Sequence, residues 1–191
     1  MNQRQQAKKT ARTLVQRLRV PAGFGAGIGF LAFARPTWVA LCAGVPIALL
    51  GAAIRAWASG YLRKNAELAT SGPYAFTRNP LYLGSLVMAL GCAVCGGILW
   101  LGALLLALFL LIYIPVIRTE AVHMQKLFGA QYEGWAAEVP LLWPRVTPFQ
   151  GGLTQGFDSG QYLRHREYRA AAGLVLVIGF LSLRAAGILE W

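Results

Sequence analysis

The chain has 191 residues, of which 57% are hydrophobic and only 13% are charged. This composition, with 22 glycines, excludes an ordinary soluble domain and indicates an integral membrane protein. The net charge of +11 does not indicate nucleic-acid binding, because that would need basic residues on a soluble face together with base-reading groups. Two histidines and seven acidic residues offer little material for a metal centre, and we predict no metal site.

The first 20 residues are basic and lack acidic side chains. Ala7, Ala11, Leu14 and Leu18 fall at helical spacing among the basic residues. This pattern predicts an interfacial helix that binds anionic lipid on the inner face of a membrane. A mitochondrial-type targeting segment has a similar composition and is the alternative.

Apolar segments follow at 23–34, 37–58, 81–117 and 170–189. The third is too long for one crossing of a hydrocarbon core about 30 Å thick. Gly91, Gly96 and Gly97 offer a break near its middle, which predicts two spans, 81–95 and 98–117. We therefore expect five spans, although the first segment is short and could instead be a re-entrant or interfacial piece.

Basic residues support this arrangement, because Lys and Arg in short loops are retained on the cytoplasmic side. Five spans with a cytoplasmic N-terminus place residues 1–20, 61–80 and 118–168 inside. With Arg169 counted just beyond them, these segments hold every basic residue except Arg35, Arg55 and Arg184. The predicted fold class is all-α: a polytopic membrane helical bundle that forms a single domain over residues 1–191. We expect it in a bacterial inner membrane.

The segment 60–84 is polar, rich in turn residues, and leads straight into an apolar helix. Asn79 is placed to cap a helix whose first residue is Pro80. The N–H groups at such a helix start, with Arg78 beside them, would attract an anion such as a ligand carboxylate. A capped span with a snorkelling arginine and an interfacial Tyr82 explains the same residues without a ligand.

In the segment 118–145, Glu120 is the lone carboxylate at the end of the apolar helix. Glu120 lies on the stripe of that helix that faces its packing partner. Gly129 is predicted to end the helix. An ion pair between Glu120 and either Arg118 or Arg78 is the purely structural alternative.

Together the two segments carry an ordered pattern. It reads Gly72-Pro73-Tyr74 and Arg78-x-Pro80-x-Tyr82-x-Gly84, then, after the two intervening spans, Glu120, Phe128-Gly129-x-x-Tyr132-x-x-Trp135 and Val139-Pro140. This pattern resembles the isoprenylcysteine carboxyl methyltransferase and phospholipid methyltransferase superfamily, over about residues 50–145. Two positions depart from the family pattern: Asn79 stands for the usual His, and Ala121 for the second Glu of the usual pair.

The resemblance implies a membrane methyltransferase that encloses S-adenosylmethionine at the cytoplasmic membrane face. Arg78 and Glu120, the candidate catalytic residues, would hold the cofactor's carboxylate and ammonium, respectively. Carried over residue by residue, the candidate cofactor-binding residues are Tyr74, Arg78, Asn79, Pro80, Tyr82, Leu83, Gly84 and Glu120.

The methyl acceptor would be a lipid-like molecule that enters from the bilayer, either an isoprenylcysteine-type carboxylate or a phospholipid amine. If it is an amine, His123 or Glu120 could accept its proton. Oligomeric state stays open. Two other functions remain: an NADPH-dependent membrane reductase of the same fold, and a membrane scaffold without chemistry, which the departures at Asn79 and Ala121 favour.

Overall fold

A computed structural model describes residues 23, 25–63, 66–152 and 156–189. The predicted interfacial helix, residues 1–20, lies outside the described residues. In the described part of the chain the all-α prediction is confirmed, with helices and no strand. The elements are α2 (Trp38–Tyr61), the short 3-10 helix η1 (Gly72–Ala75), α3 (Pro80–Cys95), α4 (Leu99–Glu138), α5 (Ser159–Arg164) and α6 (Tyr168–Ala185).

Three of these helices are long and apolar enough to cross a membrane: α2, α4 from Trp100 onward, and α6. Helix α3 is a shorter apolar helix. The predicted helical membrane bundle is thereby confirmed. In the predicted span at 23–34, the described helical residues are 23 and 25–33. A crossing there stays a prediction.

The predicted break in the long apolar run lies where α3 ends and α4 begins. Gly97 in this turn has a φ of +70°, a conformation that favours glycine. A Cβ at Gly97 would also overlap the carbonyl oxygen of Arg35. Only a residue without a side chain fits this turn.

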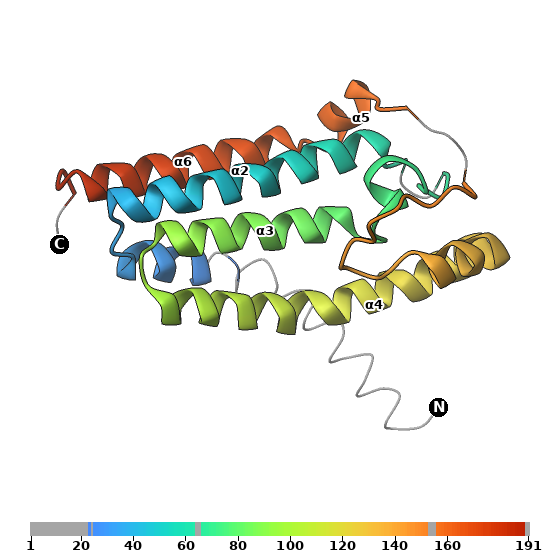
Figure 1. Ribbon diagram of the computed structural model, residues 1–191, viewed down its shortest axis with the longest axis horizontal. Coiled ribbons are helices and arrows are strands. Elements are labelled where there is room, and N and C mark those ends of the chain that lie inside the picture. The colour runs from blue at the N-terminus through green and yellow to red at the C-terminus, as the bar shows by residue number, and fades with distance from the viewer. Residues whose placement is uncertain (1–22, 24, 64–65, 153–155, 190–191) are drawn as a thin grey trace, which may run out of the picture.

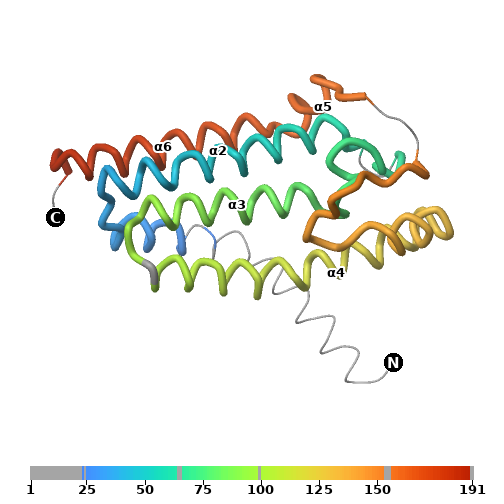
Figure 2. The backbone as a smooth tube through the Cα atoms, viewed as in Figure 1, coloured from blue at the N-terminus to red at the C-terminus, as the bar shows by residue number. Residues whose placement is uncertain are grey.

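Helices α2 and α3 approach each other closely through glycines. A Cβ on Gly91 would overlap the backbone of Ala48, and a Cβ on Gly51 would overlap the backbone of Met88. In Figure 2 the two helices run side by side, with α6 along the far side of α2 and α4 along the far side of α3. Small residues that let backbones approach are the usual means of helix packing in membranes.

Helix α4 turns back on itself at Gly129, which has a φ of +52° and a ψ of −128°. Figure 1 shows the last turns of α4 folding back beside the turns that precede them. A hydrogen bond from Gln125 Nε2 to Glu133 Oε1, 2.8 Å long, joins the two arms. Gly129 therefore ends the first helical arm as predicted, but a second arm continues to Glu138. We call this feature the α4 hairpin.

Two loop segments, 66–79 and 139–150, pair at one end of the bundle, which we call the loop end. The backbone N–H groups of Arg78 and Arg145 donate to the carbonyls of Pro140 and Phe76, each over 2.9 Å. Beneath these bonds lies a buried cluster formed by Ala58, Leu68, Ala69, Tyr74, Tyr132, Trp135 and Val139. The second arm of the α4 hairpin is thus fixed against the segment that precedes α3.

Candidate functional site

Arg78 stands immediately before α3, at the loop end. Its Nη1 donates to the hydroxyl of Tyr132 over 3.5 Å, a long and weak contact. Its Nε is buried and has no hydrogen-bond partner among the residues that the structure describes. A buried N–H group without an acceptor costs about 1–3 kcal/mol, so this nitrogen is a natural place for an anionic ligand.

Asn79 occupies the cap position of α3, but its side chain does not cap the helix. The prediction of a side-chain cap is wrong, because the Asn79 amide is directed toward the facing loop. Its Nδ2 donates to the carbonyl of Leu141 over 2.9 Å. The start of α3, with Pro80 as its first residue, therefore keeps its positive dipole end without a side-chain cap.

Glu120 and Tyr82 are brought together from α4 and α3. The Tyr82 hydroxyl donates to Glu120 Oε1 over 2.9 Å. Glu120 forms no ion pair within 4.0 Å with Arg78 or Arg118, so that alternative is wrong. The Tyr82 ring packs on Tyr113, which in turn stacks on Phe109, with ring centroids 5.4 and 4.4 Å apart. An aromatic row therefore leads from Glu120 along α4.

The other predicted cofactor-binding residues are mostly buried. Tyr74 belongs to the loop-end cluster, and Trp135 Nε1 donates to its carbonyl over 3.3 Å. Pro80 and Leu83 are also buried. Gly84 faces α2, since a Cβ there would overlap the Gly51 carbonyl oxygen and the Arg55 side chain. These residues pack around the candidate site, and the polar side chains among the predicted residues there are Arg78, Asn79, Tyr82 and Glu120.

The pKa of the Tyr74 hydroxyl is influenced by charged groups from α2, from α4 and from the residue before α6. Burial raises the pKa of Tyr74, the negative charges of Glu120 and then Glu167 raise it further, and the positive charge of Arg55 partly opposes them. Tyr74 is therefore neutral at physiological pH and lies within the field of both carboxylates.

A pocket of about 350 Å³ opens between the two arms of the α4 hairpin. Of the predicted site residues, Arg78 alone lines it. Its full lining is Arg78, Ala121, Val122, Gln125, Tyr132, Glu133, Ala136 and Ala137.

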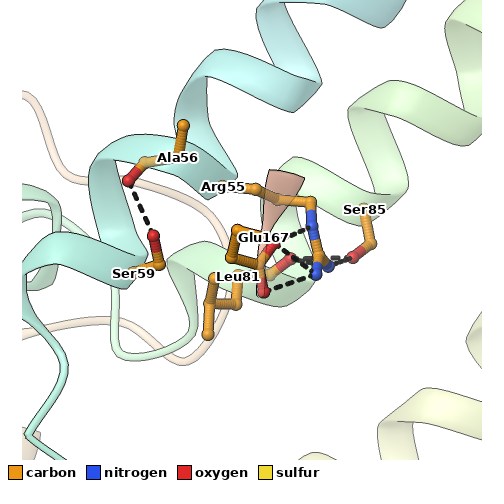
Figure 3. Close-up of polar contacts among 6 residues, drawn as sticks. All are labelled: Arg55, Ala56, Ser59, Leu81, Ser85 and Glu167. Atoms are coloured by element: carbon orange, nitrogen blue, oxygen red, sulfur yellow. Dashed lines mark hydrogen bonds and ion pairs between the residues drawn. The ribbon is translucent and has the colours of Figure 1, made fainter. Parts of the chain in front are cut away.

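Sequence reasoning missed an ion pair between Arg55 of α2 and Glu167, the residue before α6 (Figure 3). Arg55 Nη2 and Nε lie 2.8 and 3.0 Å from Glu167 Oε2, and the two side chains are only 22% and 11% exposed. Arg55 Nη1 also donates to Ser85 Oγ and to the carbonyl of Leu81 in the first turn of α3. A lone arginine in an otherwise apolar span was the available signal, because such a residue needs a partner.

Comparison with known proteins identifies the family. The family model for phospholipid methyltransferases matches residues 28–131, more than half of the chain. The chain belongs to the phospholipid methyltransferase family. The matched region of this phospholipid methyltransferase family member includes α2, α3, Arg78, Tyr82 and Glu120.

Two curated relatives of this family member are named for metal resistance. The nickel-cobalt-cadmium resistance protein NccN of Alcaligenes xylosoxydans xylosoxydans is 32% identical over 124 residues, which cover 64% of this chain and 56% of that protein. The cobalt-zinc-cadmium resistance protein CzcN of Cupriavidus metallidurans is 36% identical over 113 residues, which cover 58% and 50%. The chain thus spans about half the length of these relatives. No solved structure matches it.

Proposed function

We propose that the chain is an S-adenosylmethionine-dependent membrane methyltransferase that acts on a lipid-like acceptor at the cytoplasmic membrane face. The observation that carries the proposal is the buried, unpaired Nε of Arg78 beside the uncapped start of α3. It lies within the region matched by the family model.

These residues fit the amino-acid tail of the cofactor. A carboxylate beside Arg78 would give the buried Nε an acceptor and would be favoured by the dipole of α3. Asn79 cannot carry a proton near neutral pH, and its amide is engaged with Leu141. We assign it a positioning role, in which it ties the Arg78 backbone region to the facing loop.

When bound, S-adenosylmethionine supplies a methyl group that is already activated on a sulfonium. The chain then has to align an acceptor and exclude water. Glu120 is held by the Tyr82 hydroxyl yet exposed, so it can take the proton from an amine acceptor. A carboxylate acceptor would need no base.

The aromatic row of Tyr82, Tyr113 and Phe109 supports a lipid-like acceptor. These rings lie on two apolar helices and lead toward Glu120. An acceptor with a hydrocarbon chain can pack on such rings and present its polar head to the carboxylate. Both an isoprenylcysteine-type carboxylate and a phospholipid amine have this form.

A scaffold without chemistry is the second candidate, and one observation favours it. Asn79 stands at the position of the family's usual His, and its side-chain amide is bonded to the Leu141 carbonyl. If the structural bond is its whole role, the site has lost a functional group.

Calorimetric titration of the detergent-purified protein with S-adenosylmethionine, S-adenosylhomocysteine and NADPH separates these functions. We expect both adenosyl ligands to bind, and Arg78→Ala to weaken S-adenosylhomocysteine binding by about 10- to 100-fold, as for loss of a charged hydrogen bond. Glu120→Ala should fold normally, and it should lose methyl transfer to an amine acceptor, which needs a base. Arg63→Ala, which removes an exposed arginine at the end of α2, is the matched control and should bind normally.

Two results would contradict the proposal. Binding of none of the three ligands would favour the scaffold. Binding of NADPH alone would favour a reductase of the same fold.

A further inference from the structure

The pocket in the α4 hairpin has one positive and one negative side chain on its walls. Arg78 contributes the cation, and Glu133, from the second arm, contributes the carboxylate. The remaining polar side chains are Gln125 and Tyr132, and three of the other lining residues are alanines. Such a pocket suits a small ligand group that carries both charges.

The two charges do not neutralise each other. Arg78 and Glu133 form no ion pair within the 4.0 Å that defines one. Glu133 Oε1 accepts from Gln125 Nε2 over 2.8 Å, which orients the carboxylate and leaves Oε2 for another donor. Arg78 keeps its unpaired Nε. Both charged side chains thus line the pocket, and neither is paired with the other.

Glu120 does not line this pocket. Its carboxylate is held by Tyr82, from α3, beside the aromatic row. Ala121, by contrast, does line the pocket and contributes no charge to it. Glu133 supplies a carboxylate from the opposite arm.

We infer that the α4 hairpin pocket takes the zwitterionic α-amino-acid tail of the cofactor, with Arg78 on its carboxylate and Glu133 on its ammonium. This inference rests on the proposed function and changes one assignment within it. Glu133 replaces Glu120 as the partner of the ammonium, and Glu120 is left to serve the methyl acceptor.

Three adenosyl ligands with different tails test the inference by calorimetry. S-adenosylhomocysteine has both tail charges, decarboxylated S-adenosylmethionine has the tail ammonium without the carboxylate and also carries the sulfonium charge, and 5′-methylthioadenosine has neither tail charge. We expect Glu133→Gln to weaken binding of the first two by roughly 5- to 20-fold and to leave 5′-methylthioadenosine unchanged. Arg78→Ala should weaken S-adenosylhomocysteine alone.

Glu138→Gln is the matched control, because Glu138 lies on the same arm outside the pocket and pairs with Arg145. It should bind all three ligands like the wild type. Glu133 is exposed, so Glu133→Gln should keep the wild-type melting temperature.

Three outcomes would overturn the inference. If the wild type binds S-adenosylhomocysteine and only Glu120→Gln weakens it, Glu120 holds the ammonium and the proposed function stands. If Glu133→Gln weakens 5′-methylthioadenosine equally, its effect does not pass through the tail. If the wild type binds no adenosyl ligand, the proposed function fails with the inference.

Discussion

The side of α3 that packs on α2 and the side that faces α4 differ in how their polar groups are satisfied. On the α2 side, glycines bring the backbones together, and Arg55 is bonded to Glu167, Ser85 and Leu81. On the α4 side, Arg78 has a buried nitrogen without an acceptor, and a pocket lies beside it. In a membrane bundle, satisfied polar groups hold helices together, whereas an unpaired ionisable group is a candidate for ligand binding.

Removal of Arg55, the arginine whose hydrogen bonds join three helices, should have the largest effect on stability. Arg55→Ala leaves the Glu167 carboxylate without its partner and releases the first turn of α3, so we expect a loss of about 3 kcal/mol. Arg63→Ala breaks the exposed Arg63–Glu67 pair and should cost less than about 1 kcal/mol. Unfolding in mixed micelles by SDS titration measures both. Equal losses would contradict a special role for Arg55.

The next largest effect on stability should come from the close contact of α2 and α3 at Gly91. Gly91→Ala places a methyl group against the Ala48 backbone, which cannot move aside, and should destabilise the fold by about 1–3 kcal/mol. Gly173→Ala, in α6, meets nothing within 4 Å and should be neutral or stabilising by up to about 1 kcal/mol. The same SDS titration compares them, and a neutral Gly91→Ala would show that the two helices are not held this closely.

On the α4 side, a smaller change should affect chemistry more than stability. Tyr82→Phe removes one hydrogen bond to Glu120, worth about 1 kcal/mol, and should slow methyl transfer several-fold. Tyr113→Phe keeps the ring contact with Tyr82 and is the control. Incorporation of labelled methyl groups into membrane lipid extracts measures the rates. Equal rates for wild type and Tyr82→Phe would remove Tyr82 from the site.

The smallest effect concerns the pKa of Tyr74, which charged groups on both sides of α3 influence. Its pKa is raised in the folded state, so the folded chain keeps this proton above about pH 10, where an unfolded tyrosine releases it. The contribution of this raised pKa to the free energy of unfolding is fully present below about pH 10. It is lost as the pH rises further. Tyr74→Phe should therefore lose less stability between pH 9 and 11 than the wild type, in melting experiments. Tyr168→Phe, at an exposed tyrosine, should follow the wild type.

Much of the fold could be predicted from the sequence, because a bilayer restricts spanning segments to apolar helices of fixed length. The glycine break between α3 and α4 and the interruption at Gly129 were both visible as sequence signals. The continuation of α4 beyond Gly129 was not, since a positive φ at glycine can either end a helix or turn it back. The direction of the chain there depends on Trp135 and Val139 packing into the loop-end cluster.

The site was predictable where it is local and not where it joins distant segments. Arg78, Tyr82 and Glu120 carry a recognisable pattern around one helix start and one helix end. The Arg55–Glu167 pair joins residues 112 positions apart, and no spacing rule identifies such partners. Asn79 was assigned as a cap because its position favours one, yet a carbonyl from Leu141 competes successfully for its amide. Glu133 reaches the pocket only because the α4 hairpin folds back.

Hydrogen exchange of the protein in nanodiscs, with and without saturating S-adenosylhomocysteine, tests most directly whether the α4 side of α3 is the cofactor site. We expect slower exchange in residues 74–84 and 118–138, with α2 and α6 unchanged. Protection confined to α2 and α6, or no protection at the loop end despite measured binding, would contradict the assignment.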